Sequence, residues 1–452
     1  MIICSILLST KKQKMVNQEN LLIKDAAHIW PPCTPLNSEV SIPRLVVERA
    51  KGSYLYTNQG VVIDAISSWW CKALGHQPKP VMDAIKAQLE CFEHVIGANT
   101  TYPKQVELAE KLTALTDKQH VFFASDGSSA VEIALKLALH AMQLQGQPER
   151  SEFVTLSNSY HGETIATLSV SDVGCYRAPY EGMGLTCHVL RDLPYVSGED
   201  DALWQDCSAI WLQIEAQLNK IKSRVCAIIV EPILQGAGGM KIYSADFLKR
   251  LSAWAKQNKC YLIADEIMTG LGRTGEMLAS KHADINPDLI CLSKALTAGT
   301  MPLSCVLIDA KIYNIFDNNP DHPFLHSHTY TGHALGVAAA LATLNYMEEI
   351  DINAKAKALG VYMKRCFEQV AAATGRIKNI RSIGGMVAGD LITPDNQQIG
   401  RAVSRAALAR GALLRPLGNT IYWFPPLTSS KTVIDDLAEI TKDAINDLII
   451  FD

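Results

Sequence analysis

The sequence predicts an α/β fold, with a mostly parallel central sheet in a large domain and a smaller α+β domain built from both ends of the chain. In the middle of the chain, short apolar runs bounded by polar residues or glycine alternate with patterns of helical period. This alternation is typical of a parallel sheet that is covered by helices on both faces. From about Ala334 the chain becomes helix-rich, and it then returns to strand-like pieces near 385–391 and 421–423. The predicted strands of the large sheet are Phe153–Leu156, Ala227–Val230, Tyr261–Ala264 and Leu289–Leu292.

An amphipathic helix, with one face buried, is predicted on the N-terminal side of these strands. It opens at the segment 124–129, whose polar residues and glycine include Gly127 and Ser128. Such a helix start exposes backbone N–H groups that favour an anion, although plain N-capping is the commoner meaning of the pattern. The apolar residues that predict the buried face lie three or four positions apart, at Val131, Leu135, Ala138 and Met142.

The composition indicates a globular protein with room for two or three domains. The 452 residues are 48% hydrophobic and 19% charged, so the chain has enough apolar side chains for a large core. The net charge of −4 lacks the positive surplus that binding to a nucleic-acid backbone requires. No apolar run approaches the ~18–20 residues that span a bilayer, so we expect no membrane partner. We predict a large domain at 76–330 and a small domain made of 1–75 and 331–452.

The cysteines and the N-terminus indicate a cytoplasmic protein. Twelve cysteines are scattered along the chain without a Cys-x-x-Cys pair, which is typical of reduced thiols in the core. The apolar stretch Ile2–Leu8 precedes its lysines, the reverse of the order in a secretory signal. We therefore expect a frayed leader, with Met15 as an alternative start.

Two charged residues follow predicted strands of the sheet. Asp265 follows the strand 261–264, and Lys294 follows the strand 289–292. Ligands of an open α/β sheet bind at the carboxyl ends of its strands, so both side chains would point into one crevice. A salt bridge or a surface pair is the ordinary alternative.

Chemistry favours a cofactor site over a salt bridge. A lysine that forms a Schiff base needs an aldehyde cofactor beside it, and pyridoxal phosphate also needs an acid at its pyridine nitrogen and an anion site for its phosphate. Lys294, Asp265 and the helix start at Gly127 and Ser128 supply these three parts. Tyr160, with His161 and Gly162 directly after another strand, offers an aromatic face for the ring.

Two further motifs are interpreted as incidental. The segment 270–275 spells G-x-G-x-x-G, but Asp265 and Glu266 separate it from its strand and only a weak helical pattern follows. A dinucleotide site requires strand, turn and helix in immediate succession. The other motif is a run of histidines that matches no zinc spacing and that we interpret as part of a loop: His322, His326, His328 and His333.

With these residues together, the sequence resembles the class III pyridoxal-phosphate aminotransferases, from about His28 to Pro426. The resemblance implies the fold-type I architecture of pyridoxal-phosphate-dependent transferases. It also implies a homodimer with active sites at the subunit interface and small-molecule substrates. The motifs that carry it are Glu231-Pro232, Gln235–Gly239, Leu262–Glu266, Gly270–Gly275 and Lys294–Thr297.

Other residues narrow the resemblance to the branch of this class that acts in biotin biosynthesis. That branch converts 8-amino-7-oxononanoate to 7,8-diaminononanoate with S-adenosylmethionine as amino donor, and the double tryptophan favours this donor over lysine. An ω-amino acid:pyruvate aminotransferase and a catalytically idle scaffold are the alternatives. The narrowing residues are His28-Ile29-Trp30, Ser67–Trp70, Asn158–Gly162, Arg415-Pro416 and Pro425-Pro426.

The resemblance also assigns roles. Lys294 would carry the cofactor and Asp265 would pair with its pyridine nitrogen, while Tyr160 would lie against the ring. Arg415 would hold the substrate carboxylate, which suits a planar bidentate guanidinium. Trp69 and Trp70 would wall the substrate pocket, but adjacent residues in a strand face opposite sides, so we expect at most one pure pocket residue. The phosphate site would use Gly127, Ser128 and the partner subunit's Thr329.

The chain departs from the family pattern at two places. Ser327 and His328 stand where many relatives have glycine and proline, but the resemblance still assigns Ser327 to substrate binding and His328 to cofactor binding. Cys33 stands where relatives have a tyrosine whose hydroxyl projects toward the substrate. A cysteine is too short to replace that hydrogen bond, and its thiol is a weak donor. The pocket is therefore expected to be roomier than in relatives, unless water or a neighbouring residue fills the gap.

Overall fold

The structure is a computed structural model that describes residues 20–36, 42–393 and 397–447. The expected leader at Ile2–Leu8 and the alternative start Met15 lie outside the described residues. Within the described part, no helix is both long enough and apolar enough to cross a membrane.

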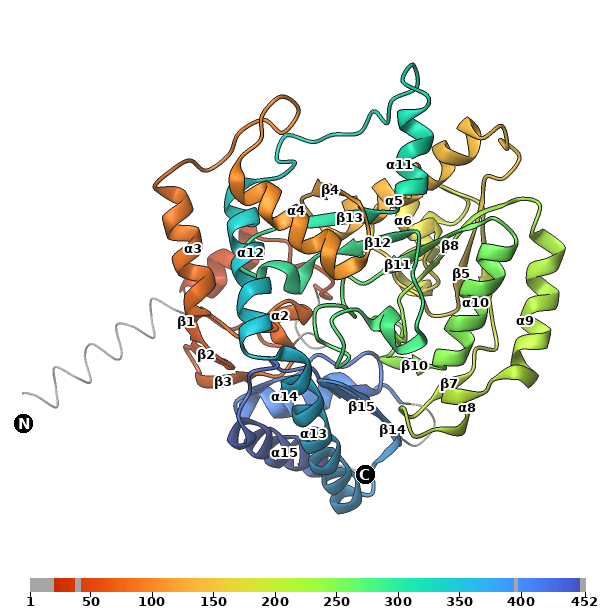
Figure 1. The fold of residues 1–452 in the computed structure, drawn as a ribbon. Coiled ribbons are helices and arrows are strands. Elements are labelled where there is room, and N and C mark those ends of the chain that lie inside the picture. Colours follow the sequence, from red (N-terminus) through yellow and green to blue (C-terminus); the bar gives the residue numbers. More distant parts are fainter. Residues whose placement is uncertain (1–19, 37–41, 394–396, 448–452) are drawn as a thin grey trace, which may run out of the picture.

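A seven-stranded sheet forms the centre of the molecule (Figure 1). Only β13 runs antiparallel to its neighbours, so the prediction of a mostly parallel sheet is confirmed. All residues of the four central strands are buried, which explains why these strands appear in the sequence as continuous apolar runs. In sheet order the strands are β4 (His120–Ala124), β13 (Ser304–Ile308), β12 (Leu289–Leu292), β11 (Tyr261–Asp265), β8 (Val225–Val230), β5 (Glu152–Leu156) and β6 (Cys187–Leu190).

Helices cover both faces of this sheet. On one face, α5 (Gly127–Leu144) packs against Ala227 and Ile229 of β8. On the other face, α10 (Ala245–Gln257) packs against Ile228 and Val230 of the same strand. The alternation of side chains along one strand thus separates two hydrophobic clusters. Other helices around this part are α3 (Lys79–Leu89), α4 (Pro103–Thr116), α9 (Ser208–Ile221), α11 (Ala310–Asp317) and α12 (Ala334–Glu349).

The two ends of the chain meet in a second sheet. In it, β1 (Val47–Lys51), β2 (Tyr54–Thr57) and β3 (Gly60–Asp64) form an antiparallel meander, and β16 (Ala412–Leu413) joins β3 in parallel. A third sheet contains β14 (Ile377–Ile383), β15 (Met386–Leu391) and β17 (Thr420–Trp423). The helices α13 (Ile352–Thr374), α14 (Gly400–Ala409) and α15 (Lys431–Asn446) lie beside it in the lower part of Figure 1. The predicted domain boundaries at residues 75 and 330 stay a prediction.

Short elements complete the connections that surround the site. A small sheet joins β7 (Tyr195–Val196), β10 (Lys241–Tyr243) and β9 (Leu234–Gln235). The segment 270–275 is a loop that is followed by no α-helix, so it lacks the strand–turn–helix succession of a dinucleotide site. The remaining helical turns are α2 (Ser67–Trp70), α6 (Ile165–Ser169), α7 (Gly174–Arg177), α8 (Ala202–Gln205), η1 (Ala178–Tyr180), η2 (Ala279–Ala283) and η3 (Lys294–Thr297).

A close backbone approach fixes the 270–275 loop against the C-terminal part of the chain. A Cβ on Gly384 would lie 2.4 Å from the carbonyl oxygen of Arg273, and a Cβ on Gly360 would lie 1.9 Å from the carbonyl oxygen of Gly384. The N–H of Gly385 also donates to the Arg273 carbonyl at 2.8 Å. Glycine is therefore required for the turn between β14 and β15 to be held between α13 and this loop.

Candidate active site

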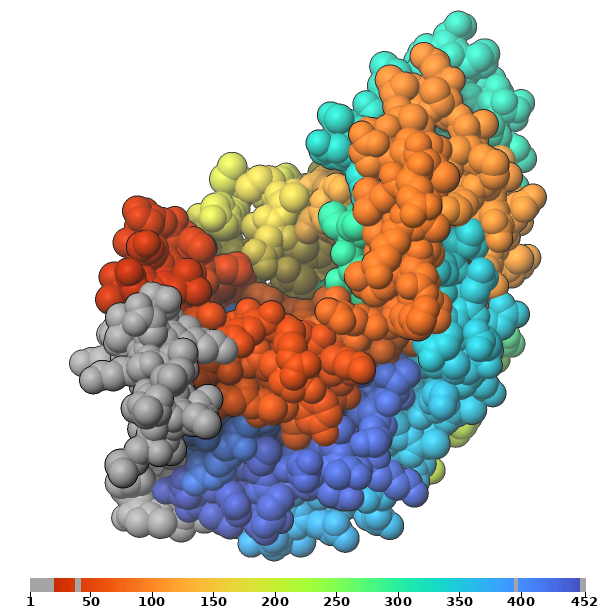
Figure 2. Space-filling view, turned by 90° about the vertical axis from the view of Figure 1, so that its left-hand side faces the viewer, coloured from red at the N-terminus to blue at the C-terminus, as the bar shows by residue number. Residues whose placement is uncertain are grey.

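A cavity of about 1500 Å³ lies where the N-terminal segment, the large sheet and the C-terminal part of the chain meet. Its lining includes six residues that the sequence singled out: Cys33, Trp69, Trp70, Tyr160, Lys294 and Arg415. Figure 2 shows one face of the molecule, which is hollowed between red, yellow and orange segments from the first half of the chain. The structure therefore brings together residues that are almost four hundred positions apart in the sequence.

Lys294 begins η3, directly after strand β12 and Ser293. Its backbone has a positive φ of 44°, and its amine lies 5.2 Å from the centre of the Trp70 ring. Burial lowers the pKa of the Lys294 amine, while the carboxylates of Asp265 and Glu231 oppose that shift. A lowered pKa increases the fraction of neutral amine, which is the nucleophilic form.

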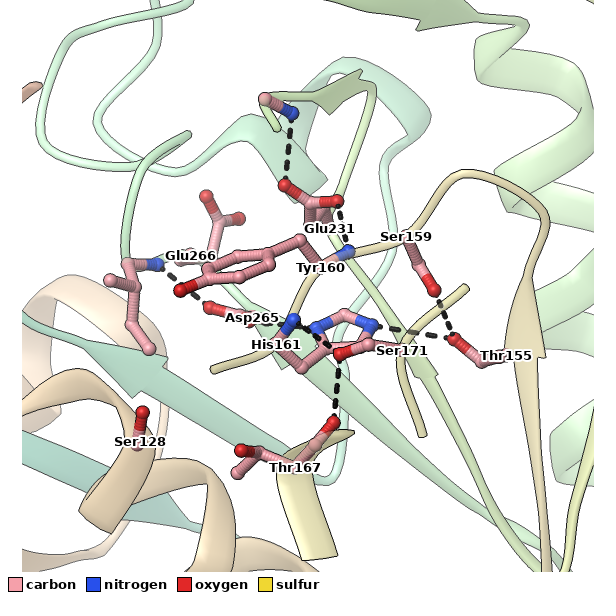
Figure 3. Close-up of polar contacts among 12 residues, drawn as sticks. Ser128, Thr155, Ser159, Tyr160, His161, Thr167, Ser171, Glu231, Asp265 and Glu266 are labelled. Atoms are coloured by element: carbon pink, nitrogen blue, oxygen red, sulfur yellow. Dashed lines mark hydrogen bonds and ion pairs between the residues drawn. The ribbon is translucent and has the colours of Figure 1, made fainter. Parts of the chain in front are cut away.

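Asp265 ends strand β11 and is almost completely buried (Figure 3). Its carboxylate accepts a hydrogen bond from Nδ1 of His161 at 2.8 Å and another from the N–H of Ile267 at 3.2 Å. The imidazole is buried too, and its Nε2 lies 3.4 Å from the Thr155 hydroxyl. The backbone N–H of His161 donates to the Ser171 hydroxyl at 2.9 Å, so the main chain of His161 is held in place as well as its ring. His161 thus orients a carboxylate that would otherwise be buried without a side-chain donor.

A second carboxylate, Glu231, follows strand β8 and joins two loops of the site. One oxygen accepts the N–H of Tyr160 at 3.0 Å, and the other accepts the N–H of Gly236 at 3.0 Å (Figure 3). Burial raises the pKa of Glu231 to about 7, and Asp265 adds to the rise while His161 and the two N–H groups oppose it. Glu231 therefore holds the backbone that carries Tyr160.

The helix start at Gly127 and Ser128 lies next to these groups. Asp126 caps α5 by accepting the N–H of Ser129, whereas the N–H groups of Gly127 and Ser128 stand in a first turn that offers them no helical acceptor. A Cβ on Gly162 would lie only 2.3 Å from the Ser128 hydroxyl oxygen, so glycine lets the loop after Tyr160 pass over the helix start. This close passage brings the N-terminus of α5 next to the loop that carries Tyr160.

In the described part of the chain, six predicted residues are absent from the residues that line the cavity. Asp265, Gly127 and Ser128 lie beside it, since His161 contacts Asp265 and the N–H of Glu163 donates to the Ser128 hydroxyl at 3.4 Å. Ser327, His328 and Thr329 lie in the connection between α11 and α12, and they are absent from the residues that line the cavity. The carbonyl of Thr329 accepts a hydrogen bond from Nε2 of His94 at 2.7 Å, and the N–H of His328 donates to the Thr331 hydroxyl at 3.3 Å. Thr329 is exposed. The role expected for Ser327, His328 and Thr329 requires a second subunit and stays a prediction.

The double tryptophan corrects an expectation. Trp69 and Trp70 lie in no strand, and both line the cavity. The residues Ser67, Ser68, Trp69 and Trp70 have φ values of 50°, 45°, 69° and 72°, so α2 is a turn of left-handed backbone. The assumption that the two tryptophans lie in a strand was therefore wrong. Trp70 is nearly buried against Tyr422 and Phe424, whereas Trp69 is about one-third exposed.

Such a turn is costly, because left-handed backbone costs roughly 1–2 kcal/mol for each residue that has a Cβ. It persists only when its surroundings hold it in place. The hydroxyl of Ser67 donates to the carbonyl of Phe424 at 2.7 Å, and the indole N–H of Trp70 donates to the Tyr422 hydroxyl at 3.2 Å. A buried carboxylate, Asp64, holds the middle of the turn.

Arg415 and Cys33 meet at the cavity wall. The guanidinium of Arg415 lies 4.2 Å from the centre of the Trp69 ring and donates to the carbonyl of Cys33 at 3.1 Å. The Cys33 thiol lies 4.0 Å from the carboxylate of Glu163, which also accepts the Tyr160 hydroxyl at 2.8 Å. The site therefore presents a cation at one wall and a carboxylate at another.

Several residues of this arrangement were not predicted from the sequence. His161 and Glu231 stood in the recognised motifs, but their contacts with Asp265 and with the Tyr160 loop were not predicted. Glu163 and Asp64 were not singled out at all. Glu231 and Asp64 could have been identified by their positions in the sequence, because Glu231 follows a buried strand and Asp64 ends a strand whose last residues are buried.

Comparison with known proteins identifies the family. The family described as aminotransferase class III matches residues 36–445. The adenosylmethionine-8-amino-7-oxononanoate aminotransferase of Helicobacter pylori is 38% identical over 438 residues, which is 94% of this chain and 98% of that protein. The crystal structure of the protein with this name from Methanocaldococcus jannaschii DSM 2661 is 29% identical, with a TM-score of 0.85, and covers 95% of this chain and 99% of that one.

A PLP-bound amine transaminase from an uncultivated Pseudomonas species has a TM-score of 0.86 at 30% identity, over 93% of this chain and 98% of that one. The family match and the relatives both extend over nearly the whole chain, and the site has its lysine and its aspartate at the ends of neighbouring strands. The expected fold-type I architecture is confirmed by the same comparisons. This chain belongs to the class III aminotransferases.

Proposed function

We propose that this protein transfers an amino group from S-adenosylmethionine to 8-amino-7-oxononanoate and yields 7,8-diaminononanoate for biotin biosynthesis, with pyridoxal phosphate as cofactor. The observation that carries the proposal is the Lys294 amine, which lines the cavity, has a lowered pKa and shares one site with the carboxylate of Asp265. The name and near-complete coverage of the Helicobacter pylori relative support the substrate pair.

The residues of the site fit pyridoxal phosphate. Lys294 offers an amine of lowered pKa, and Asp265 offers a carboxylate that His161 already orients. Gly127 and Ser128 offer the N–H groups of a helix start for a phosphate. When bound, the cofactor supplies an aldehyde that takes up amino groups and a ring that delocalises negative charge from the substrate carbon.

Each of these residues then has a definite task. Lys294 would hold the aldehyde of the cofactor between turnovers and, once free, would move a proton to and from the substrate carbon. Asp265 would hold a proton at the pyridine nitrogen, and His161 keeps its carboxylate in place for that role. Tyr160 would cover the ring, and Glu231 holds the Tyr160 backbone through one N–H group.

The substrate groups find complementary partners in the cavity. Arg415 binds the carboxylate of the keto acid, because its guanidinium is partly desolvated over Trp69. The amino group of that substrate is cationic near neutral pH and faces the carboxylate of Glu163. The two tryptophans form an apolar wall for the hydrocarbon chain between the two charges.

We further propose a homodimer in the cytoplasm. In the described part of the chain, Thr329 is exposed and its carbonyl contacts His94 rather than the loop of Tyr160, which supports a role of this loop at the partner's phosphate site. In that arrangement, Thr329 of the partner subunit contributes a hydroxyl to the phosphate.

The substrate pair is tested with a panel of amines and acceptors. The loaded protein should form 7,8-diaminononanoate from S-adenosylmethionine and 8-amino-7-oxononanoate, measured by mass spectrometry. Lysine, or ω-amino acids with pyruvate, should react far more slowly. Faster turnover with either of these pairs would assign the chain to a different branch of the class. Protein freed of cofactor is the control and should be inactive with every pair.

Changing Lys294 to alanine should abolish turnover, because the variant has neither the attachment point for the aldehyde nor the amine that moves the proton. Borohydride reduction followed by intact mass spectrometry should add the mass of the cofactor to the parent and not to Lys294→Ala. Lys79→Ala removes an amine from the protein surface and is the matched control. An appreciable fraction of the parent rate in Lys294→Ala would remove this lysine from the mechanism.

Changing Arg415 to alanine should weaken use of the keto acid while cofactor binding stays near the parent value. A lost charge-assisted contact costs about 1.5–3 kcal/mol, so kcat/KM for 8-amino-7-oxononanoate should fall roughly 10- to 150-fold. Arg410→Ala removes an arginine that pairs with Asp447 at the surface and should leave kcat/KM unchanged. An unaltered kcat/KM in Arg415→Ala would exclude Arg415 from substrate binding.

Changing Cys33 to tyrosine should improve use of the keto acid, because a hydroxyl would reach further into the cavity than the thiol. One neutral hydrogen bond contributes about 0.5–1.5 kcal/mol, so kcat/KM should rise roughly 2- to 13-fold in a steady-state titration at saturating donor. Cys33→Ala is the control and should differ little from the parent, because the contact of the thiol with the Glu163 carboxylate is long, at 4.0 Å, and a thiol is a weak donor. No gain in Cys33→Tyr would mean that the cavity is adapted to the cysteine.

A further inference from the structure

The left-handed turn at Ser67–Trp70 raises the question of what holds Trp69 in the cavity wall. The residues on either side of it are anchored: Ser67 by the Phe424 carbonyl, and Trp70 by the Tyr422 hydroxyl. Ser68 is anchored by Asp64, whose carboxylate accepts both its N–H at 2.9 Å and its hydroxyl at 2.7 Å. The Trp69 ring lies against the Arg415 guanidinium, 4.2 Å from the ring centre.

Asp64 is well suited to hold a strained turn. Its side chain is fully buried at the end of β3, and Nε2 of His76 donates to it at 2.8 Å. His76 is fixed in turn by two backbone hydrogen bonds with Gly52, at 2.8 and 3.0 Å. Burial alone would raise the pKa of Asp64, but the hydrogen bonds from His76 and Ser68 outweigh burial and hold its pKa below the ordinary value. The carboxylate therefore stays charged, and a charged acceptor forms the stronger hydrogen bonds.

We propose that Asp64 is a positioning residue that holds Ser68 in left-handed backbone and thereby fixes the Trp69 ring under Arg415. The consequence for substrate binding rests on the function proposed above, in which Arg415 binds the carboxylate of the keto acid. The consequence for the Trp69 ring does not rest on that function, so the two are measured separately.

The ring is observed directly by fluorine NMR of protein labelled with 5-fluorotryptophan, both with and without pyridoxal phosphate. The chain has seven tryptophans, and Trp69→Phe and Trp70→Phe variants assign the two relevant signals. In Asp64→Asn, the Trp69 signal should shift and broaden. The Trp70 signal should change less, because its hydrogen bond to Tyr422 remains. A general loosening of the fold would instead move both signals, and that outcome would overturn the proposal.

Two variants of Ser68 separate backbone strain from the loss of a hydroxyl. Ser68→Ala and Ser68→Gly both remove the hydrogen bond from the hydroxyl, but only glycine adopts a positive φ without a Cβ penalty. Ser68→Gly should therefore unfold at a higher urea concentration than Ser68→Ala, and adding Ser68→Gly to Asp64→Asn should bring the Trp69 signal back toward that of the parent. A more stable Ser68→Ala would contradict the proposal even if Asp64→Asn failed to fold.

The kinetic measurement completes the test. In Asp64→Asn, the KM for 8-amino-7-oxononanoate should rise roughly tenfold, the lower end of what the loss of a charge-assisted hydrogen bond produces, with a smaller change in kcat. Asp83→Asn changes an exposed aspartate of α3 and should leave both values unaltered. Unchanged fluorine signals in Asp64→Asn would overturn the proposal whatever the kinetics. Shifted signals without turnover of this substrate would point instead to a different function.

Discussion

The arrangement of the site depends on supplying hydrogen-bond donors to carboxylates that are buried at the ends of strands. A buried charge without partners is far too costly to persist, so the loops after the strands must bring donors to it. Asp265 receives them from His161 and Ile267, and Glu231 receives them from the N–H groups of Tyr160 and Gly236. The hydrogen bonds that these two carboxylates accept therefore fix the loop that carries Tyr160, His161 and Gly162.

A buried cation needs hydrogen-bond partners for the same reason. Arg273 finds them in the C-terminal part of the chain, and so it links that part to the loop at 270–275. Arg273 is almost fully buried, and burial lowers its pKa to about 9. Its guanidinium donates to the carbonyls of Gly385 and Pro425 at 2.8 and 2.9 Å and lies 3.7 Å from the centre of the Phe424 ring. Phe424 in turn accepts the Ser67 hydroxyl through its carbonyl. The G-x-G-x-x-G segment, which resembled a dinucleotide motif in the sequence, therefore serves as a structural link to the tryptophan turn.

Much of the fold could be predicted from the sequence because it depends on local patterns. The strand at 289–292 was predicted at its observed bounds, and those at 153–156, 227–230 and 261–264 within two residues. Apolar runs of this length have few alternatives when polar residues bound them. The placement of Asp265 and Lys294 in one site followed from the same rule, since β11 and β12 are parallel neighbours.

The turn at Ser67–Trp70 could not be predicted in this way. Nothing in the local sequence favours left-handed backbone at four residues that all have a Cβ. Its conformation is decided by partners far along the chain, at Tyr422 and Phe424, and by the buried Asp64. Local preference predicts a segment well where local and tertiary forces agree, and it fails where long-range contacts hold a strained conformation. Here the strained turn lies in the cavity wall, and it carries Trp70, whose ring centre is 5.2 Å from the Lys294 amine.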